Sequence, residues 1–152
     1  MKHSPLRRGR ELAVQMLYER ELSGADVGQL LESIDGTWVP SEEAKGSAAE
    51  MVRGVVARIT EIDEILSSVS ENWAVGRMSV VDRSCLRLAC YELMARKDVA
   101  FRIIIDEAIE VAKRYGEEKS GAFVNGILDA IARRLRPEEV AKIEPPSPSV
   151  RG

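Results

Sequence analysis

The chain has 152 residues, of which 45% are apolar and 31% charged, with a formal net charge of −3. This length suits a single domain that buries roughly two-thirds of its unfolded surface, and the composition is typical of soluble globular proteins. No apolar run approaches the roughly 20 residues that span a bilayer, and no apolar stretch of a secretory signal opens the chain, so we expect a cytoplasmic protein without membrane contact.

The first ten residues carry four cationic side chains and no carboxylate: Lys2, Arg7, Arg8 and Arg10. They create a local positive field on a mildly acidic chain, and nucleic-acid phosphates respond to local charge. A basic terminus of this kind is more often only solvated, so charge alone leaves both interpretations open.

Helical periodicity dominates the sequence, and no segment alternates as a strand. The first predicted helix begins at Pro5 and ends near Leu22, before Gly24. A turn of 100° per residue gives it an apolar face of Leu12, Ala13, Met16 and Leu17 and a polar face of Arg7, Arg8, Glu11, Gln15 and Tyr18. Tyr18 on that polar face suits either a partner protein or a neighbouring helix.

A short helix is predicted over residues 27–34, and Ser41 is expected to cap the next one. Apolar residues then recur at alternating spacings of four and three from Ala48 to Val69, which indicates packing within a bundle. The segment 60–63 has the pattern of a helix cap, so we expect a break near Thr60. Such a break would divide the domain into halves of about residues 5–59 and 60–136.

The helix predicted over residues 79–96 has apolar positions around more than half of its circumference, which places it at the centre of the bundle. Cys85 and Cys90 are about 140° apart on it, so they are expected in the core and not in a bridge. The remaining strip carries Asp82, Arg83, Arg87 and Tyr91. It is either a solvated strip or a surface for protein docking.

Two further helices are predicted over residues 103–115 and 119–135, with Phe123 at the edge of the last apolar stripe. Residues 137–152 are rich in proline and are expected to be disordered. The single histidine and the lack of a glycine-rich phosphate loop or a nucleophile motif argue against metal, cofactor or catalytic sites. The sequence therefore predicts an all-α, compact bundle of about seven helices that binds other molecules and is not an enzyme.

Four segments resemble the NusB family of bacterial transcription antitermination factors, in order and at matching spacing: 7–18 (RRGRELAVQMLY), 82–93 (DRSCLRLACYEL), 105–116 (IDEAIEVAKRYG) and 123–129 (FVNGILD). The resemblance covers about residues 5–135 and implies an all-α fold of two small packed halves. It also implies binding to boxA RNA of ribosomal RNA leader transcripts together with NusE, a small-subunit ribosomal protein, and an indirect link to the RNA polymerase antitermination complex.

By this resemblance the RNA site comprises Arg7, Arg8, Arg10, Gln15, Lys119 and Phe123. Arginine binds phosphate and stacks on bases, and an edge-placed phenylalanine offers a stacking face to an unpaired base. The corresponding surface for NusE comprises Tyr18, Leu22, Asp82, Arg83 and Arg87. Gly9 between the arginines costs about 1 kcal/mol of helix stability, which favours an N-terminal segment that orders only on RNA.

Two alternatives remain at this stage. Similar domains precede ribosomal RNA methyltransferases of the RsmB type, but no second domain or nucleotide-binding loop follows here. A protein-only adaptor, or a self-associating bundle whose basic terminus is incidental, would fit the same composition. A homodimer of the free protein, which would cover the arginines, is also compatible with the sequence.

Overall fold

The protein is described by a computed structural model, which covers residues 5–35, 41–70 and 73–143. These residues form eight α-helices and one 3-10 turn without a strand, which confirms the all-α prediction: α1 (Pro5–Ser23), α2 (Val27–Asp35), α3 (Glu42–Ala57), α4 (Ile59–Val69), η1 (Val75–Arg77), α5 (Val80–Ala95), α6 (Phe101–Tyr115), α7 (Ser120–Leu135) and α8 (Pro137–Ile143).

The helix ends follow the capping residues that the sequence indicated. The Ser41 hydroxyl accepts a hydrogen bond from the Ala44 amide at 3.0 Å, and the Ser79 hydroxyl accepts one from the Asp82 amide at 3.1 Å. Gly24 has φ +76°, a left-handed conformation that glycine adopts without strain, directly after α1. Local chemistry therefore sets these boundaries.

A single residue separates α3 from α4. Arg58 has φ −117° and ψ 24°, so α3 ends at Ala57 and α4 begins at Ile59. The predicted apolar seam is buried on both sides of this break, for example through Val55 and Ile62. The break predicted near Thr60 is therefore confirmed, and it lies at Arg58, two residues earlier in the chain.

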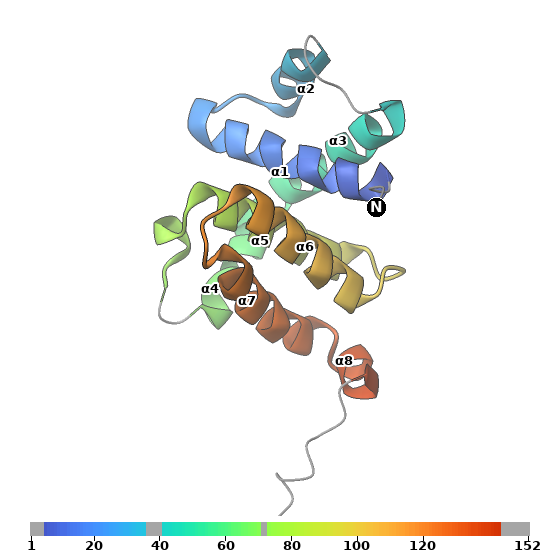
Figure 1. Cartoon of the computed structure of the whole chain (residues 1–152), viewed down its shortest axis with the longest axis vertical. Coiled ribbons are helices and arrows are strands. Elements are labelled where there is room, and N and C mark those ends of the chain that lie inside the picture. Colours follow the sequence, from blue (N-terminus) through green and yellow to red (C-terminus); the bar gives the residue numbers. More distant parts are fainter. Residues whose placement is uncertain (1–4, 36–40, 71–72, 144–152) are drawn as a thin grey trace, which may run out of the picture.

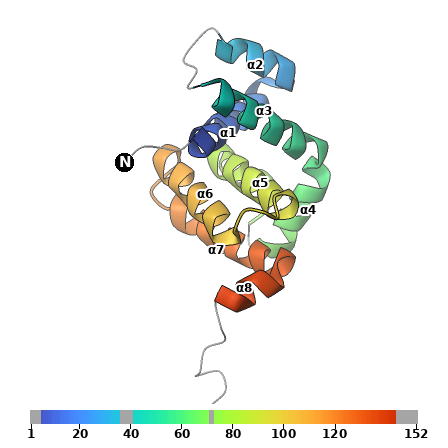
Figure 2. The ribbon, with the colours of Figure 1, turned by 90° about the vertical axis from the view of Figure 1, so that its right-hand side faces the viewer.

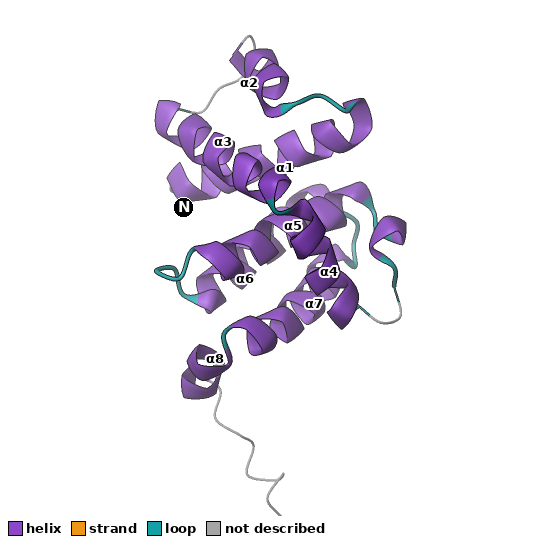
Figure 3. Cartoon of the chain, turned by 180° about the vertical axis from the view of Figure 1, so that it is seen from behind, coloured by secondary structure: helices purple, strands orange, loops and turns teal. Residues whose placement is uncertain are grey.

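The helix α5 lies at the centre of the bundle, as its apolar circumference predicted, and contacts α1, α3, α4, α6 and α7 (Figure 2). The first three helices pack together at one end of the molecule, while α6, α7 and α8 occupy the other (Figures 1 and 3). Cys85 and Cys90 are free and buried in α5, and burial raises the pKa of each thiol to about 12. Both are core residues, as expected.

The prediction of disorder from Pro137 onward is wrong for residues 137–143, which form α8 and bury Val140. The reason is Arg136, whose guanidinium donates to the carbonyl oxygens of Leu93, Arg96 and Val99. These bonds fasten the start of α8 to the end of α5. The rest of the predicted tail, residues 144–152, lies outside the described residues.

The expectation that Gly9 leaves the N-terminal segment unordered is also wrong for residues 5–10, which are the first turns of α1. Gly9 is buried, and a Cβ there would lie 3.0 Å from the Ser47 hydroxyl oxygen. The glycine therefore allows α1 and α3 to approach closely, and this packing offsets its low helix propensity.

Candidate nucleic-acid and partner interface

The start of α1 presents its arginines in three different environments. Arg8 is exposed and makes no ion pair within the described chain. Arg7 donates through Nε and Nη2 to both carboxylate oxygens of Glu107, at 2.7 and 2.6 Å. Its hydrogen bond to Glu107 raises the pKa of Arg7, so this residue stays charged at the edge of the α1–α6 contact.

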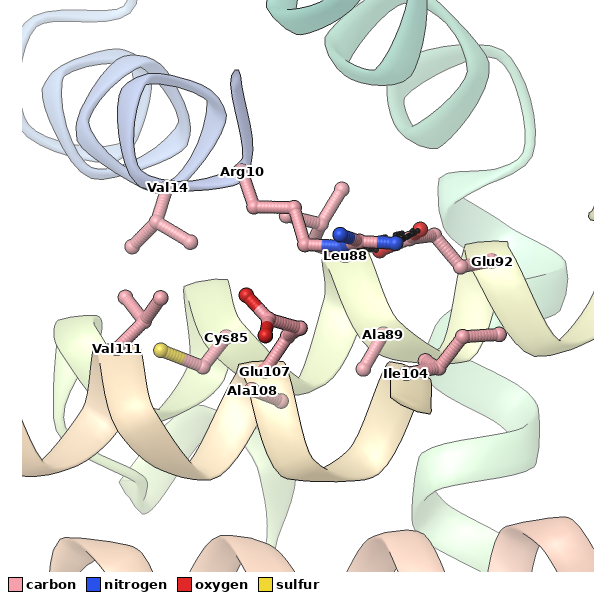
Figure 4. Close-up of a pocket in the computed structure, with 10 residues that line it drawn as sticks. All are labelled: Arg10, Val14, Cys85, Leu88, Ala89, Glu92, Ile104, Glu107, Ala108 and Val111. Atoms are coloured by element: carbon pink, nitrogen blue, oxygen red, sulfur yellow. Dashed lines mark hydrogen bonds and ion pairs between the residues drawn. The ribbon is translucent and has the colours of Figure 1, made fainter. Parts of the chain in front are cut away.

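Arg10 differs from both, because its side chain is buried with only 4% of the residue exposed. Its guanidinium points at the Glu92 carboxylate of α5 and makes bonds of 2.8 Å to each oxygen (Figure 4). Glu92 is itself 1% exposed. Arg10 therefore joins α1 to α5 in the interior, and we correct the expectation that it belongs to a surface for RNA.

The other residues expected near RNA lie at the start of α7 and along α1. Lys119, which directly precedes α7, and Gln15 are exposed, and Phe123 is half-buried where its ring packs against the core. The start of α7 lies close beside α6: a Cβ added to Gly121 would lie only 2.8 Å from Cγ of Lys113. Helices α1, α6 and α7 follow one another on the near side of the molecule in Figure 1.

The expected partner surface combines exposed apolar groups with ion pairs. Tyr18 and Leu22 of α1 are 38% and 62% exposed. Beside them, Glu21 accepts hydrogen bonds from Arg83 at 3.3 Å and from Arg87 at 3.0 Å. Burial opposes ionisation of Glu21, but the two arginines outweigh it and lower the pKa of this carboxyl.

The two arginines of α5 are less accessible than the sequence suggested. Arg83 is 8% exposed and also donates to the carbonyl oxygens of Val75 and Met78, so it holds η1 against α5. Arg87 makes a forked pair with Asp63 of α4, with both bonds at 2.9 Å. Burial works against the charge of Arg87, but Asp63 and Glu21 together raise its pKa.

Asp82 is partly buried, and its Oδ1 has no hydrogen-bond partner among the described residues. A shielded carboxylate oxygen without a donor is unusual in a protein, since such groups are nearly always satisfied.

Sequence reasoning missed the acidic members of both sites: Glu21, Asp63, Glu92 and Glu107. Each pairs with an arginine at least 24 positions away in the chain. A helical spacing rule reaches only three or four residues, so no local signal could have found them.

Among the described residues, no group of three or more His, Cys, Asp or Glu side chains is placed to hold a metal ion, and no helix is long and apolar enough to cross a membrane. What the geometry provides is an exposed cation at a helix start and an apolar surface bordered by ion pairs. These features define an all-helical protein built for binding.

The model of the NusB family matches residues 7–133. A transcription antitermination protein NusB of Geobacter sulfurreducens is 48% identical over 85% of this chain and 94% of its own length, and that of Thermotoga maritima is 46% identical over 90% and 96%. A solved structure of T. maritima NusB has a TM-score of 0.79 at 44% identity, and covers 91% of this chain and 98% of its own. The chain belongs to the NusB family.

One further solved structure bears on the interface. It is a crystal structure of antitermination factors NusB and NusE in complex with dsRNA. It matches with a TM-score of 0.77 at 30% identity, over 86% of this chain and 97% of its own.

Proposed function

We propose that this protein is a cytoplasmic transcription antitermination factor that binds boxA RNA of ribosomal RNA leader transcripts together with NusE. The observation that carries the proposal is the match, over 86% of this chain, to the NusB chain in a structure of NusB and NusE in complex with dsRNA. Relatives of nearly the same length that are named as transcription antitermination proteins support it.

The proposed RNA surface consists of the exposed cations of α1 and of the start of α7. Arg8 and Lys119 are both accessible, and Arg7 retains a quarter of its side-chain exposure beside Glu107. Phe123 and Gln15 add an aromatic ring and an amide. This set supplies the charges and the stacking face that single-stranded RNA needs. Arg10 is left out, because Glu92 occupies its guanidinium in the interior.

The proposed NusE surface consists of Tyr18, Leu22, Asp82 and Arg87. The buried Arg83 supports it by holding Glu21 and η1 in place. An apolar pair next to polar groups is a common composition at the centre and rim of a protein interface. Asp82→Lys reverses one charge of this surface and is expected to weaken NusE binding while the far-UV circular dichroism stays unchanged. Full affinity of this variant in a titration with labelled NusE would remove Asp82 from the surface.

The test of the function is fluorescence anisotropy of a short boxA RNA titrated with the protein, with and without NusE, at two salt concentrations. We expect binding that weakens with salt, because phosphate contacts release counterions, and that tightens when NusE is present. An RNA of the same length with a scrambled sequence is the control. Folded protein that binds neither RNA nor NusE would overturn the proposal.

Phe123→Ala separates stacking from packing at the RNA surface. If the ring stacks on a base, the affinity of fully folded protein falls by about 1–3 kcal/mol. If the ring only packs against the core, the melting temperature falls and the RNA affinity of the folded fraction stays the same. Titration at a temperature where wild type and variant are both folded distinguishes the two outcomes.

A further inference from the structure

A charged groove with a volume of about 320 Å³ lies between α1 and α6. It is lined by Arg7, Glu11, Glu110, Lys113 and Arg114. The proposed RNA surface lies on both sides of it: Arg8 follows Arg7 on α1, and the Lys113 side chain contacts the start of α7 at Gly121. An RNA strand that reaches both the start of α1 and the start of α7 therefore passes this groove.

Two cations of the groove, Arg7 and Arg114, are held in place by a carboxylate of the facing helix. Of these two, Arg114 is the more exposed. Its Nη1 donates to Oε2 of Glu11 at 2.9 Å, and its side chain is 53% exposed, while that of Glu11 is 10% exposed. A guanidinium carries five N–H donors, and Glu11 takes one of them. The carboxylate thus positions the guanidinium and leaves most of its donors for a ligand at the surface.

The arrangement at Arg7 is the opposite. Both Nε and Nη2 are bound by Glu107, whose carboxylate points from α6 toward α1 (Figure 4). This forked geometry is the one in which a guanidinium would also hold two oxygens of a phosphate. A phosphate at Arg7 must therefore compete with Glu107.

We infer that the α1–α6 groove is a site for a phosphate of RNA. Arg114, positioned by Glu11, binds this phosphate directly. The carboxylate of Glu107 competes with the phosphate for the guanidinium of Arg7. This inference rests on the proposed function, because it assumes that the bound nucleic acid is RNA at this surface. It adds Arg114 as a ligand and gives Glu107 the role of a residue that limits RNA affinity.

The first experiment replaces Arg114 and compares it with a matched arginine of the same helix. Arg102 is 37% exposed, is paired with Asp106, and lies about 18 Å from Arg114 along α6 at 1.5 Å per residue. We expect Arg114→Ala to weaken boxA RNA binding about fivefold, because the strongest exposed ion pairs contribute about this factor. The slope of log affinity against log salt should fall by about 0.7, which is the loss of one single-strand phosphate contact. Arg102→Ala should change neither quantity.

The second experiment removes the competing carboxylate. Glu107→Gln should tighten RNA binding severalfold, although it removes an ion pair and lowers the melting temperature. Asp106→Asn removes the same charge from the neighbouring position of α6, away from the groove, and should leave the affinity unchanged. A purely structural role for Glu107 predicts the contrary result, an affinity that is unchanged or reduced together with the loss of stability.

The outcomes separate this inference from the proposed function. If wild type binds boxA RNA with NusE, but Arg114→Ala keeps the full salt slope or Glu107→Gln fails to tighten binding, the inference is overturned and the function stands. If wild type binds no RNA, the proposed function fails first. All titrations are made where urea unfolding shows each variant to be fully folded.

Discussion

Two regions of this molecule hold arginines at helix ends, and they use them differently. At the start of α1, Arg8 is exposed and Arg7 lies at the edge of a groove. At the junction of α5, α7 and α8, Arg136 is 5% exposed and donates to four backbone carbonyl oxygens and to Glu139. The first region leaves positive charge at the surface, whereas in the second the charge of Arg136 holds helix ends together.

The difference lies in the acceptors that surround each guanidinium. Carbonyl groups at the end of a helix lack part of the hydrogen bonding that a helix interior provides, and Arg136 donates to those of Glu92, Leu93 and Arg96. At the start of α1 the backbone offers amide groups, which do not accept from arginine, so an arginine there either finds a carboxylate or faces solvent. Arg10, which pairs with Glu92 in the interior, belongs with Arg136, although Arg7 and Arg8 lie close to it in the sequence and are at the surface.

The largest expected effect is that of Arg10→Ala, which tests this grouping directly. Removing the guanidinium leaves the Glu92 carboxylate buried without a partner, so the free energy of unfolding in urea should fall by about 3–5 kcal/mol. The control Arg10→Met with Glu92→Leu replaces the pair by apolar groups and should restore most of this loss. Wild-type stability for the single variant would place Arg10 with the surface arginines.

Arg136→Ala is expected to cost about 2–3 kcal/mol in the same assay, because carbonyl groups at the end of α5 lose a charged donor. Arg133→Ala is the matched control, since Arg133 also lies near the end of α7 but is 54% exposed and pairs with nearby Asp129 on its own helix. That control should change the stability by less than about 0.5 kcal/mol. Equal effects of the two variants would contradict the structural role of Arg136.

Arg8→Ala tests the surface member of the comparison. The free energy of unfolding should stay within about 0.5 kcal/mol of wild type, because the side chain is exposed. The salt slope of RNA binding should fall by about 0.7, the contribution of one phosphate contact. A variant with lower stability and an unchanged slope would show that Arg8 serves the fold.

The smallest expected effect concerns Glu139 and acid pH. Burial opposes its ionisation, but hydrogen bonds from the Phe101 amide and from Arg136 outweigh it and lower the pKa of the Glu139 carboxyl. A lowered pKa stabilises the fold above the ordinary glutamate value of 4.5, and this contribution is lost as the pH falls through the folded-state pKa. Urea unfolding of Glu139→Gln should therefore depend less on pH below 4.5 than that of wild type, and parallel curves would contradict the contact.

Much of the fold followed from local rules. The caps at Ser41 and Ser79, the central position of α5 and the break at Arg58 were all predictable, because hydrophobic periodicity and capping depend on residues within a few positions of one another. The candidate RNA residues came from a family resemblance instead, and their availability was not predictable. Whether Arg7, Arg8 or Arg10 faces solvent depends on which carboxylate of α5 or α6 packs against α1.

The sequence by itself determined the helical class, the order and approximate length of seven of the helices, the apolar core and the membership of the NusB family, since these depend on local pattern and on shared motifs. Only the tertiary structure decided that Arg10 is interior, that Gly9 serves the contact of α1 with Ser47, and that Arg136 orders α8. These outcomes depend on contacts between residues far apart in the chain. A buried charged side chain destabilises the fold strongly unless such a contact gives it a partner in the interior.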